Sequence, residues 1–370
     1  EMRLLNLELR NFRNLKDTGL EFSPAVNLIT GRNSQGKTNL LEAIYLFCLG
    51  RSFRSSNRSD MISFGRDHLF LKADVQGDTG MSETIEVGME RSGDRRIKVN
   101  GAKVDRFSDV IGKVPGVLFT AGDVELVAGA PSARRSFIDH TASQISSEYL
   151  VNLREYYRAL RQRNAELKGE GEKRGRGLTR ALAVILAEKG EKVVSGRHKV
   201  LSDIRESSME LMKNIFTDRV DIGMKYISSV KLQKRSYSES MIRVLESRED
   251  EEIRKGYTVA GPHRDDIRIT MDKVNMRKYG SQGRKRLIAI VMKIAQAEVI
   301  NSRKGEKPLV LLDDIFSELD LGIEREVGNF ISGKYQNFIT SPREMDLAIP
   351  EESARFTVEN GIIKVSGGSR

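Results

Sequence analysis

The sequence predicts an α/β protein whose two ends form one mixed sheet, with a helical segment inserted between them. Residues 26–30 are a short apolar run that leads at once into a glycine loop and then into apolar residues at helical spacing. From residue 256 strand and helix patterns alternate again, whereas the pattern between about 146 and 216 is helical throughout. We therefore expect one domain of residues 1–140 and 256–370, and an inserted helical domain of residues 141–255.

Short strands dominate the first part of the chain. Residues 2–8 read as a strand, and residues 69–104 alternate between apolar and polar side chains in short runs, which predicts an antiparallel β subdomain after the first helix. Asn100-Gly101 and Asn360-Gly361 are pairs that tolerate positive φ, so each predicts a tight hairpin turn. The second of these hairpins, with strands at 356–359 and 362–365, follows the apolar strands expected at 308–312 and 336–340.

The helical middle reads as an antiparallel pair. Apolar residues recur at steps of three and four from 150 to 167 and again from 186 to 215, with a Gly/Lys/Arg-rich stretch at 169–177 between them. We interpret both apolar stripes as core. Gly190 and Gly196 each cost about 1 kcal/mol inside a helix, so we expect a kink or a break in the second helix.

Composition narrows the class of protein. The 370 residues carry a formal net charge of +10, which favours a polyanionic partner such as nucleic acid but does not by itself require one. The single cysteine, Cys48, lies in an apolar stretch, so we expect a packed thiol, no disulfide framework and a reducing cytoplasmic location. No apolar run is long enough to span a membrane, and we expect no membrane association.

A phosphate-binding loop follows the strand at 26–30. The pattern G-x-x-x-x-G-K-[ST] is matched in full, which predicts binding of ATP and Mg²⁺. Its glycines let backbone N–H groups face phosphate oxygens, Lys37 supplies charge to the β and γ phosphates from a solvent-facing loop, and Thr38 offers a hydroxyl to the metal. The predicted ATP-binding residues are Gly31, Arg32, Asn33, Ser34, Gln35, Gly36, Lys37 and Thr38.

Two further stretches carry charge or anion-binding character. The apolar strand at 308–312 ends in Asp313 and Asp314, of which we expect the first to hold Mg²⁺ and the second to orient the attacking water. Ser281, Gln282 and Gly283 precede a strongly apolar helix at 287–300. They form either an anion site at a helix N-terminus or an ordinary serine cap, and the neighbouring motifs favour the anion site.

In this order the motifs resemble an ABC-type ATPase head of the SMC-like branch, and the whole chain resembles the RecF family of bacterial recombination mediators. The resemblance rests on the loop, on Ser281-Gln-Gly, on Asp313-Asp314 with Ser317 to Asp320, and on stretches at 9–15, 51–54, 118–120, 126–129, 134–135 and 261–266.

The resemblance implies an ATP-dependent homodimer that binds duplex DNA at single-strand gaps. In that arrangement Lys37 and Asp314 are catalytic, Ser317 and Asp320 belong to a D-loop at the dimer face, and the stretch beginning at Ser281 caps the partner's ATP in trans. The resemblance further implies RecO and RecR as partners, loading of RecA onto gapped DNA, and a cytoplasmic, nucleoid-associated location.

Several positions depart from the wider ABC pattern. Asp314 stands where most heads have glutamate, and no histidine occupies the switch position near Thr340 and Ser341. Gln282 and Arg284 replace the usual glycine and glutamine of the signature, and Asp123 lies near the place of the Q-loop glutamine. The shorter acid and the missing histidine predict slow hydrolysis, with ATP acting as a timer.

Two alternatives and one ambiguity remain. A monomeric P-loop kinase or the energy subunit of a transporter would also explain Lys37 and Asp313, but neither gives the Ser281 stretch or the positive charge a purpose. Basic residues are dense on the first helix of the insertion and its tip, where Arg161 and Arg174 are the DNA-contact candidates and a solvated helix face is the alternative. The other members of this group are Arg154, Arg158, Arg163, Lys168, Lys173, Arg176 and Arg180, and Arg134 and Arg135 could equally serve the fold.

Overall fold

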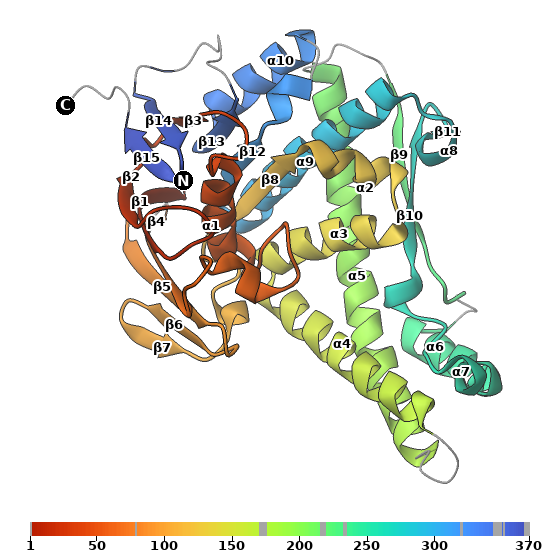
Figure 1. The fold of residues 1–370 in the computed structure, drawn as a ribbon. Helices are drawn as coiled ribbons and strands as arrows, with labels where there is room; N and C mark the ends of the chain where they lie inside the picture. The colour runs from red at the N-terminus through yellow and green to blue at the C-terminus, as the bar shows by residue number, and fades with distance from the viewer. Residues whose placement is uncertain are drawn as a thin grey trace. The chain divides into compact units, whose positions relative to one another are not determined.

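The computed structural model describes residues 2–77, 80–169, 176–214, 220–231, 235–318, 321–342, 350 and 352–365. The chain divides into two compact units (Figure 1). Unit 1 comprises residues 1–123, 211–218 and 290–370, and unit 2 comprises residues 124–210 and 219–289. Within unit 1 both ends of the chain contribute strands to one sheet, as the sequence predicts. The domain boundaries expected at 140 and 255 stay a prediction.

The first sheet of unit 1 is largely parallel. Its described strands follow the order β15-β14-β3-β13-β12-β8, and only the edge strand β15 runs antiparallel to its neighbour. The strand β13 separates β3 from β12, so the loops that follow β3 and β12 emerge at the same edge of the sheet. The strands are β3 (Val26–Thr30), β8 (Gly116–Thr120), β12 (Leu309–Asp313), β13 (Asn337–Ser341), β14 (Ala354–Glu359) and β15 (Ile362–Val365).

The second sheet of unit 1 is antiparallel and has the order β2-β1-β4-β5-β6-β7. It confirms the predicted β subdomain, and the N-terminal strand joins this sheet rather than the parallel one. Both predicted hairpin turns are present, with positive φ at Asn100 and Gly101 (51° and 79°) and at Asn360 and Gly361 (49° and 78°). The strands are β1 (Arg3–Arg10), β2 (Thr18–Glu21), β4 (His68–Gln76), β5 (Ser82–Glu90), β6 (Arg95–Val99) and β7 (Ala102–Val104).

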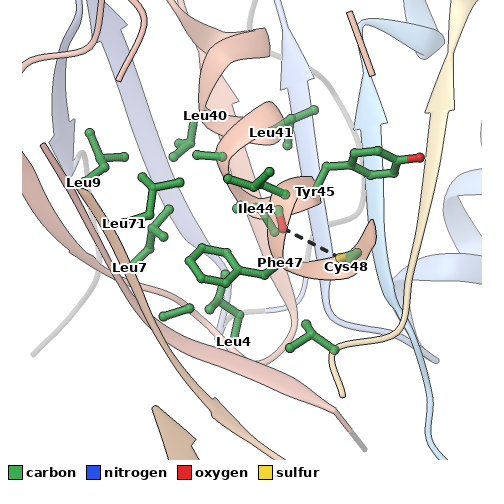
Figure 2. Close-up of a cluster of buried hydrophobic side chains, with 14 of the residues drawn as sticks. Leu4, Leu7, Leu9, Leu40, Leu41, Ile44, Tyr45, Phe47, Cys48 and Leu71 are labelled. Carbon is green, nitrogen blue, oxygen red and sulfur yellow. Dashed lines mark hydrogen bonds between the residues drawn. The ribbon is translucent and has the colours of Figure 1, made fainter. Parts of the chain in front are cut away.

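The helix α1 (Lys37–Leu49) lies in the core of unit 1, and nearly all of its side chains are buried. It contacts β8, β12 and β13, while leucines of β1 and β4 belong to the same apolar cluster (Figure 2). A helix that is apolar on all sides is expected only where both faces are covered. Cys48 is fully buried there and its thiol lies 3.7 Å from the carbonyl oxygen of Ile44, so the predicted packed thiol is confirmed. Burial raises the pKa of Cys48 to about 12.

Unit 2 is mainly helical and carries a small antiparallel sheet of order β11-β10-β9. Its helices begin with α2 (Glu125–Ala128) and α3 (Pro131–Ile145), and α4 (Ser147–Lys168) and α5 (Arg176–Asn214) follow. The later elements are β9 (Ile222–Ile227), α6 (Tyr237–Ser247), α7 (Glu249–Lys255), β10 (Asp266–Met271), β11 (Val274–Asn275) and α8 (Met276–Tyr279). The helix α9 (Gln282–Lys304) begins in unit 2 and continues into unit 1, where α10 (Leu321–Ser332) follows β12.

The predicted break in the second long helix is wrong. The helix α5 runs through 39 residues and includes both glycines. A Cβ atom on Gly196 would lie 2.4 Å from Cδ2 of Tyr149, and one on Gly190 would lie 3.3 Å from Sδ of Met241. The glycines therefore permit close packing against α4 and α6, and this packing outweighs their low helix propensity.

The apolar stripe of α5 is buried as predicted, at Leu186, Val193, Val200, Ile204 and Leu211, while Ile215 lies outside the described residues. The buried face of α4 is rotated by about one residue from the predicted stripe. Tyr156 is fully buried, whereas its neighbour Tyr157 is half-buried. Arg163, one of the basic residues expected on a solvated or DNA-facing surface, is also buried and pairs with Glu252 at 2.7 Å.

Candidate nucleotide site

The loop between β3 and α1 has the backbone that a phosphate cradle requires. Gly31 and Gly36 adopt φ values of 148° and 122°, and Ser34 adopts 64°. A Cβ atom on Gly31 would lie 2.3 Å from the carbonyl oxygen of Val358, and one on Gly36 would lie 2.7 Å from Cδ2 of Leu15. Both positions therefore exclude any larger residue, for reasons of space as well as of backbone angle.

Lys37 is buried, with 3% of its surface exposed, so the expectation of a solvent-facing side chain is wrong. The side chain turns back into the loop, where Nζ donates to the carbonyl oxygens of Gly31 (2.9 Å) and Arg32 (3.3 Å). The Oδ2 atom of Asp314 lies 4.0 Å away. The ammonium is thus held mainly by neutral acceptors in the middle of the loop, where it would meet a phosphate group.

Thr38 and Asp313 meet at the shared edge of the parallel sheet, as the two motifs predict. The hydroxyl of Thr38 donates to Oδ1 of Asp313 at 2.8 Å, and the hydroxyl of Thr340 reaches the same oxygen at 3.0 Å. Burial raises the pKa of the Asp313 carboxyl, while the hydrogen bonds from Thr38 and Thr340 act in the opposite direction. A cation beside this carboxylate would favour its charged form.

The donor set fits Mg²⁺, which prefers oxygen ligands and commonly takes one or two of them from protein and the rest from phosphate and water. The hydroxyl of Thr38 and the carboxylate of Asp313 supply two such oxygens at the mouth of the phosphate loop. Across the described residues no group of three or more His, Cys, Asp or Glu side chains could hold a metal ion. A Mg²⁺ ion here would therefore complete its shell with nucleotide oxygens and water.

Asp314 lies in a left-handed backbone conformation, with φ of 50°. Its N–H donates to the hydroxyl of Thr340 at 2.9 Å, which fixes the turn after β12. Asp and Asn are the residues that most readily adopt this conformation apart from glycine. The turn places the carboxylate on the Lys37 side of the site, half-exposed, where a water molecule could reach it.

The C-terminal hairpin supports the phosphate loop, a contact that sequence reasoning missed. The side-chain oxygen of Gln35 accepts a hydrogen bond from the N–H of Asn360 at 2.6 Å, and its carbonyl oxygen accepts one from the N–H of Gly361 at 3.1 Å. Asn14 also reaches the Gln35 carbonyl oxygen, at 3.4 Å. No sequence pattern connects position 35 with position 360, because the contact is purely tertiary.

Glu42 of α1 contacts residues from two of the stretches that carry the family resemblance, 9–15 and 51–54. Its fully buried carboxylate accepts two hydrogen bonds from Arg13, at 2.8 and 2.6 Å, and a further one from the hydroxyl of Ser52. Arg54 lies 4.0 Å from Glu42 and donates to Asn39 at 2.5 Å. These residues fix the helix that follows the phosphate loop, which explains why charged residues occur in an otherwise apolar segment.

Other predicted positions belong to other elements of the chain. Ser281, Gln282 and Gly283 are exposed at the start of α9 in unit 2, where the Ser281 hydroxyl caps the helix by accepting from the N–H of Arg284 at 3.4 Å. Ser317 belongs to a turn at Ile315–Glu318, while Asp320 and Arg174 lie outside the described residues. Arg161 is exposed on α4.

Asp123 belongs to a partly buried charge pair. Its carboxylate accepts from the N–H of Thr120 at 2.7 Å and lies 3.9 Å from Nζ of Lys293. Burial raises the pKa of Asp123 and lowers that of Lys293. The residue near the expected Q-loop position is therefore packed against α9 within unit 1.

A second network of buried charges occupies unit 2. Arg197 is fully buried and pairs with both oxygens of Asp139 at 2.8 Å, and it also donates to the carbonyl oxygen of Pro262 at 2.7 Å. Arg134 forms two hydrogen bonds with Asp266, at 2.8 and 3.2 Å, and is almost fully buried. The stretch 261–266 is thus a packing centre, and Arg134 serves the fold.

The parallel sheet carries the phosphate loop, the Thr38 hydroxyl and the acidic pair Asp313 and Asp314 at one edge. This fold and this arrangement are those of a P-loop ATPase head of the ABC type. A family model described as "RecF/RecN/SMC N terminal domain" matches residues 3–364. A solved SMC head bound to the C-winged helix domain of ScpA covers 99% of this chain and 98% of its own, at a TM-score of 0.58 and 18% identity, which supports the fold alone.

More specific similarity extends over the whole chain. The protein "DNA replication and repair protein RecF" of Ligilactobacillus salivarius (strain UCC118) is 36% identical, covering 98% of this chain and 97% of the relative. The same-named protein of Clostridium perfringens (strain SM101 / Type A) is 34% identical, covering 98% and 100%. A solved structure entitled "Structure of the recombination mediator protein RecF-ATP in RecFOR pathway" matches at a TM-score of 0.91 and 32% identity, covering 99% and 98%. The chain belongs to the RecF family.

This membership decides against the kinase and transporter readings. None of the described helices combines the length and the apolar character that crossing a membrane requires.

Proposed function

We propose that this chain is an ATP-dependent DNA-binding protein of recombinational repair. It dimerises on ATP, binds duplex DNA at single-strand gaps and assists the loading of RecA together with RecO and RecR. The observation that carries the proposal is the convergence of Lys37, Thr38 and Asp313 at one edge of the parallel sheet. The names of the relatives, which refer to replication, repair and the RecFOR pathway, support the biological setting.

Each residue of the site has a role in this proposal. The N–H groups of residues 31–38 and the Lys37 ammonium bind the phosphates of ATP, while Thr38 and Asp313 hold Mg²⁺. The metal, when bound, neutralises charge that develops on the phosphate oxygens. Asp314, whose carboxylate lies on the Lys37 side of the site, orients the attacking water.

Slow hydrolysis follows from two features of the site. Asp314 has a shorter side chain than the glutamate of most heads, so it reaches less far toward an attacking water. Thr340, near the expected switch position, is buried and bonded to Asp313 and to the backbone of Asp314. A threonine hydroxyl cannot replace the proton chemistry of histidine near neutral pH. ATP therefore serves as a timer for the DNA complex.

The dimer completes the site in trans. In this proposal the exposed start of α9, at Ser281 to Gly283, binds the phosphates of ATP carried by a second chain, and Ser317 and Asp320 lie at the dimer face. A helix N-terminus with exposed N–H groups suits that task. The helical insertion of residues 141–255 is proposed as a short arm that contacts DNA through Arg161, which is exposed on α4, and through Arg174.

Mixing two inactive variants tests the dimer. Lys37→Ala and Ser281→Arg are each expected to be inactive alone, because each damages both sites of a homodimer. In a mixed dimer one site carries both changes and the other is intact, so hydrolysis should partly recover. Wild-type hydrolysis per chain should also rise with protein concentration. A rate per chain that stays constant across a hundredfold dilution, over which sedimentation shows both monomer and dimer, would contradict the proposal.

A DNA titration tests the partner. Gapped, duplex and single-stranded DNA are compared with and without ATP and Mg²⁺, using fluorescence anisotropy. We expect binding that saturates only with ATP, strongest for gapped duplex and with weak sequence preference, because contacts to the backbone carry no base information. Equal binding in the presence and absence of ATP would remove the nucleotide from the DNA-binding step.

A further inference from the structure

A basic pocket of about 420 Å³ lies in unit 2, between the segment after β9 and one face of α6. The cations that line it are Lys231, Arg235, Arg243 and Arg248, and three serines contribute hydroxyl groups. The lining contains no carboxylate. The hydroxyls of Ser240 and Ser247 donate to the carbonyl oxygens of Ser236 (2.9 Å) and Val244 (3.0 Å), so the donors that the pocket offers to a phosphate group are its guanidinium and ammonium groups.

The helix α6 presents this surface in an ordered way. Ser240, Arg243 and Ser247 are spaced by three and four residues, so they lie on one helix face, while Met241 and Leu245 are buried on another. A capping box formed by Ser236 and Glu239 fixes the start of the helix. The polar face is therefore held in place by a helix whose other face is anchored in the core.

The floor of the pocket is rigid. Both the N–H and the hydroxyl of Ser229 donate to Oδ1 of Asp265 at 2.7 Å. The other oxygen of Asp265 accepts from the hydroxyl of Tyr226 at 2.7 Å, and Asp265 itself is fully buried. Both donors of Ser229 are therefore engaged with Asp265, so Ser229 fixes the shape of the pocket, and the groups left to bind an anion are the four cations.

Among the described residues, the cations of the pocket have no close carboxylate partner, and the electrostatic interaction of Arg248 with Glu251 balances only one of them. In the described part of the chain, none of the four cations forms an ion pair with an aspartate or glutamate. Four like charges around one pocket repel each other, and an anion that enters relieves this repulsion. Since the proposed function brings a phosphate polymer to the protein, we propose that this pocket receives a phosphate of the DNA backbone. The inference rests on that proposed function and adds a contact site on α6 outside the helical pair α4 and α5.

Salt dependence provides the first measurement. In the full chain with ATP and Mg²⁺, Arg243→Gln/Arg248→Gln should weaken duplex binding and make the log–log salt slope less steep by about 0.9, because one lost phosphate contact contributes about 0.9. A matched control, Lys199→Gln/Arg254→Gln, removes two exposed charges of unit 2 that do not line the pocket. The control should shift the slope by less than half as much, and ATP hydrolysis without DNA should be unchanged in both.

Crosslinking provides the second measurement. Cys48 is fully buried, so a cysteine placed at Ser247 is the accessible thiol for an azidophenacyl photocrosslinker. Ser202→Cys, an exposed serine on α5, is the control. We expect crosslinks to DNA at position 247 with ATP present and several-fold fewer at position 202.

The outcomes separate the pocket from the wider proposal. If wild-type protein binds DNA with ATP, but the slope of the pocket variant equals that of its control and crosslinking at 247 does not exceed that at 202, the pocket is not a DNA site and the proposed function stands. In that case the anion it serves is another one, such as an acidic peptide. If wild-type protein does not bind DNA under any of these conditions, the proposed function fails, and this inference fails with it.

Discussion

Two buried cations, one in each unit, have opposite surroundings. Lys37 in the phosphate loop is 3% exposed and donates to two neutral carbonyl oxygens, whereas Arg197 in unit 2 is fully buried and bound to both oxygens of Asp139. A cation whose charge is matched by a carboxylate serves the fold. One that is held by carbonyl groups keeps its charge available for an anion. The identity of the partners, more than the degree of burial, therefore distinguishes a structural charge from a binding one.

Removal of Arg197 should have the largest effect on stability. Arg197→Met leaves Asp139 buried without its partner, which costs about 3–5 kcal/mol in the free energy of unfolding. Thermal unfolding followed by circular dichroism measures the loss. The double variant Arg197→Met/Asp139→Leu removes both charges and should recover most of it. If the single variant unfolds within a degree of wild type, Arg197 does not have the structural role that its partners indicate.

Substitution of Asp314 by Asn should leave the fold intact and reduce hydrolysis. Asn tolerates the left-handed backbone at this position, so the change removes a charge and the proposed water-orienting group without added strain. We expect hydrolysis to slow by about a hundredfold, ATP to bind still, and DNA complexes to last longer. Complexes that dissociate as fast as those of wild type, in the presence of ATP, would show that Asp314 is not the hydrolytic residue.

Lys37→Ala is the direct counterpart of the Arg197 change. We expect ATP affinity to fall by about 1.5–3 kcal/mol, a factor of roughly 10 to 150, because hydrogen bonds to charged groups are lost. ATP-dependent DNA binding should then disappear at ordinary nucleotide concentrations. The unfolding temperature should change little, since the ammonium donates hydrogen bonds only to carbonyl oxygens among the described residues and Asp314, its nearby carboxylate, is half-exposed at 4.0 Å. Calorimetry that gives the wild-type ATP affinity would reject the assignment of the loop.

His263 extends the comparison to pH. Burial, together with nearby arginines, lowers the pKa of His263 to about 4, and its two ring nitrogens contact the Tyr156 hydroxyl at 2.6 Å and the Thr258 carbonyl oxygen at 3.0 Å. The neutral ring satisfies both contacts, with one nitrogen accepting and the other donating.

The unfolded chain takes up this proton near pH 6.5, whereas the folded chain does so only near pH 4. The stability of the neutral form is therefore complete above about pH 6.5 and is progressively lost between pH 6.5 and 4. The expected loss at pH 5 is roughly 2 kcal/mol. The free energy of unfolding of wild type and of His263→Gln is measured above pH 6.5 and at pH 5. The variant should lose roughly 2 kcal/mol less stability than wild type on acidification. Equal losses of stability in the two proteins would show that His263 is not the group whose lowered pKa causes the loss.

The smallest expected effect lies on the surface of the arm. Arg161 is exposed two positions before the buried Arg163, which pairs with Glu252. Charge reversal of Arg161 and Arg174 should leave stability unchanged and make the salt slope of DNA binding, expected near −5 for about six contacts, less steep by about 2. Arg163→Ala is the contrasting variant and should lower stability. An unchanged slope and affinity in the charge-reversed protein would show that this face is only solvated.

Local patterns predicted the elements and the site, and tertiary packing determined what they missed. The strand at 26–30, the hairpin turns at 100–101 and 360–361, and the meeting of Thr38 with Asp313 follow from short motifs and from strand order. The continuity of α5 does not, because the space beside Gly196 depends on Tyr149 of another helix.

Charged residues were the second source of error. Arg163 and Lys37 both read as solvent-facing because lysine and arginine usually are, and only the three-dimensional structure shows the partners that bury them. The partners of Lys37 lie within the loop itself, at Gly31 and Arg32, yet its direction depends on how the loop folds back. Glu252, the partner of Arg163, lies 89 positions away along the chain.

The order of synthesis imposes a condition on the phosphate loop. The strand β3, which leads into the phosphate loop, pairs only with β13 and β14 among the described strands. Within the loop, Gln35 accepts hydrogen bonds from Asn360 and Gly361. Asn360 lies 325 positions after Gln35. While the ribosome is still making the middle of the protein, the loop has neither the sheet nor the turn that shapes it. A nascent chain therefore acquires its nucleotide site only after residue 361 has been made, and truncated products that lack the hairpin of β14 and β15 should be unable to compete for ATP.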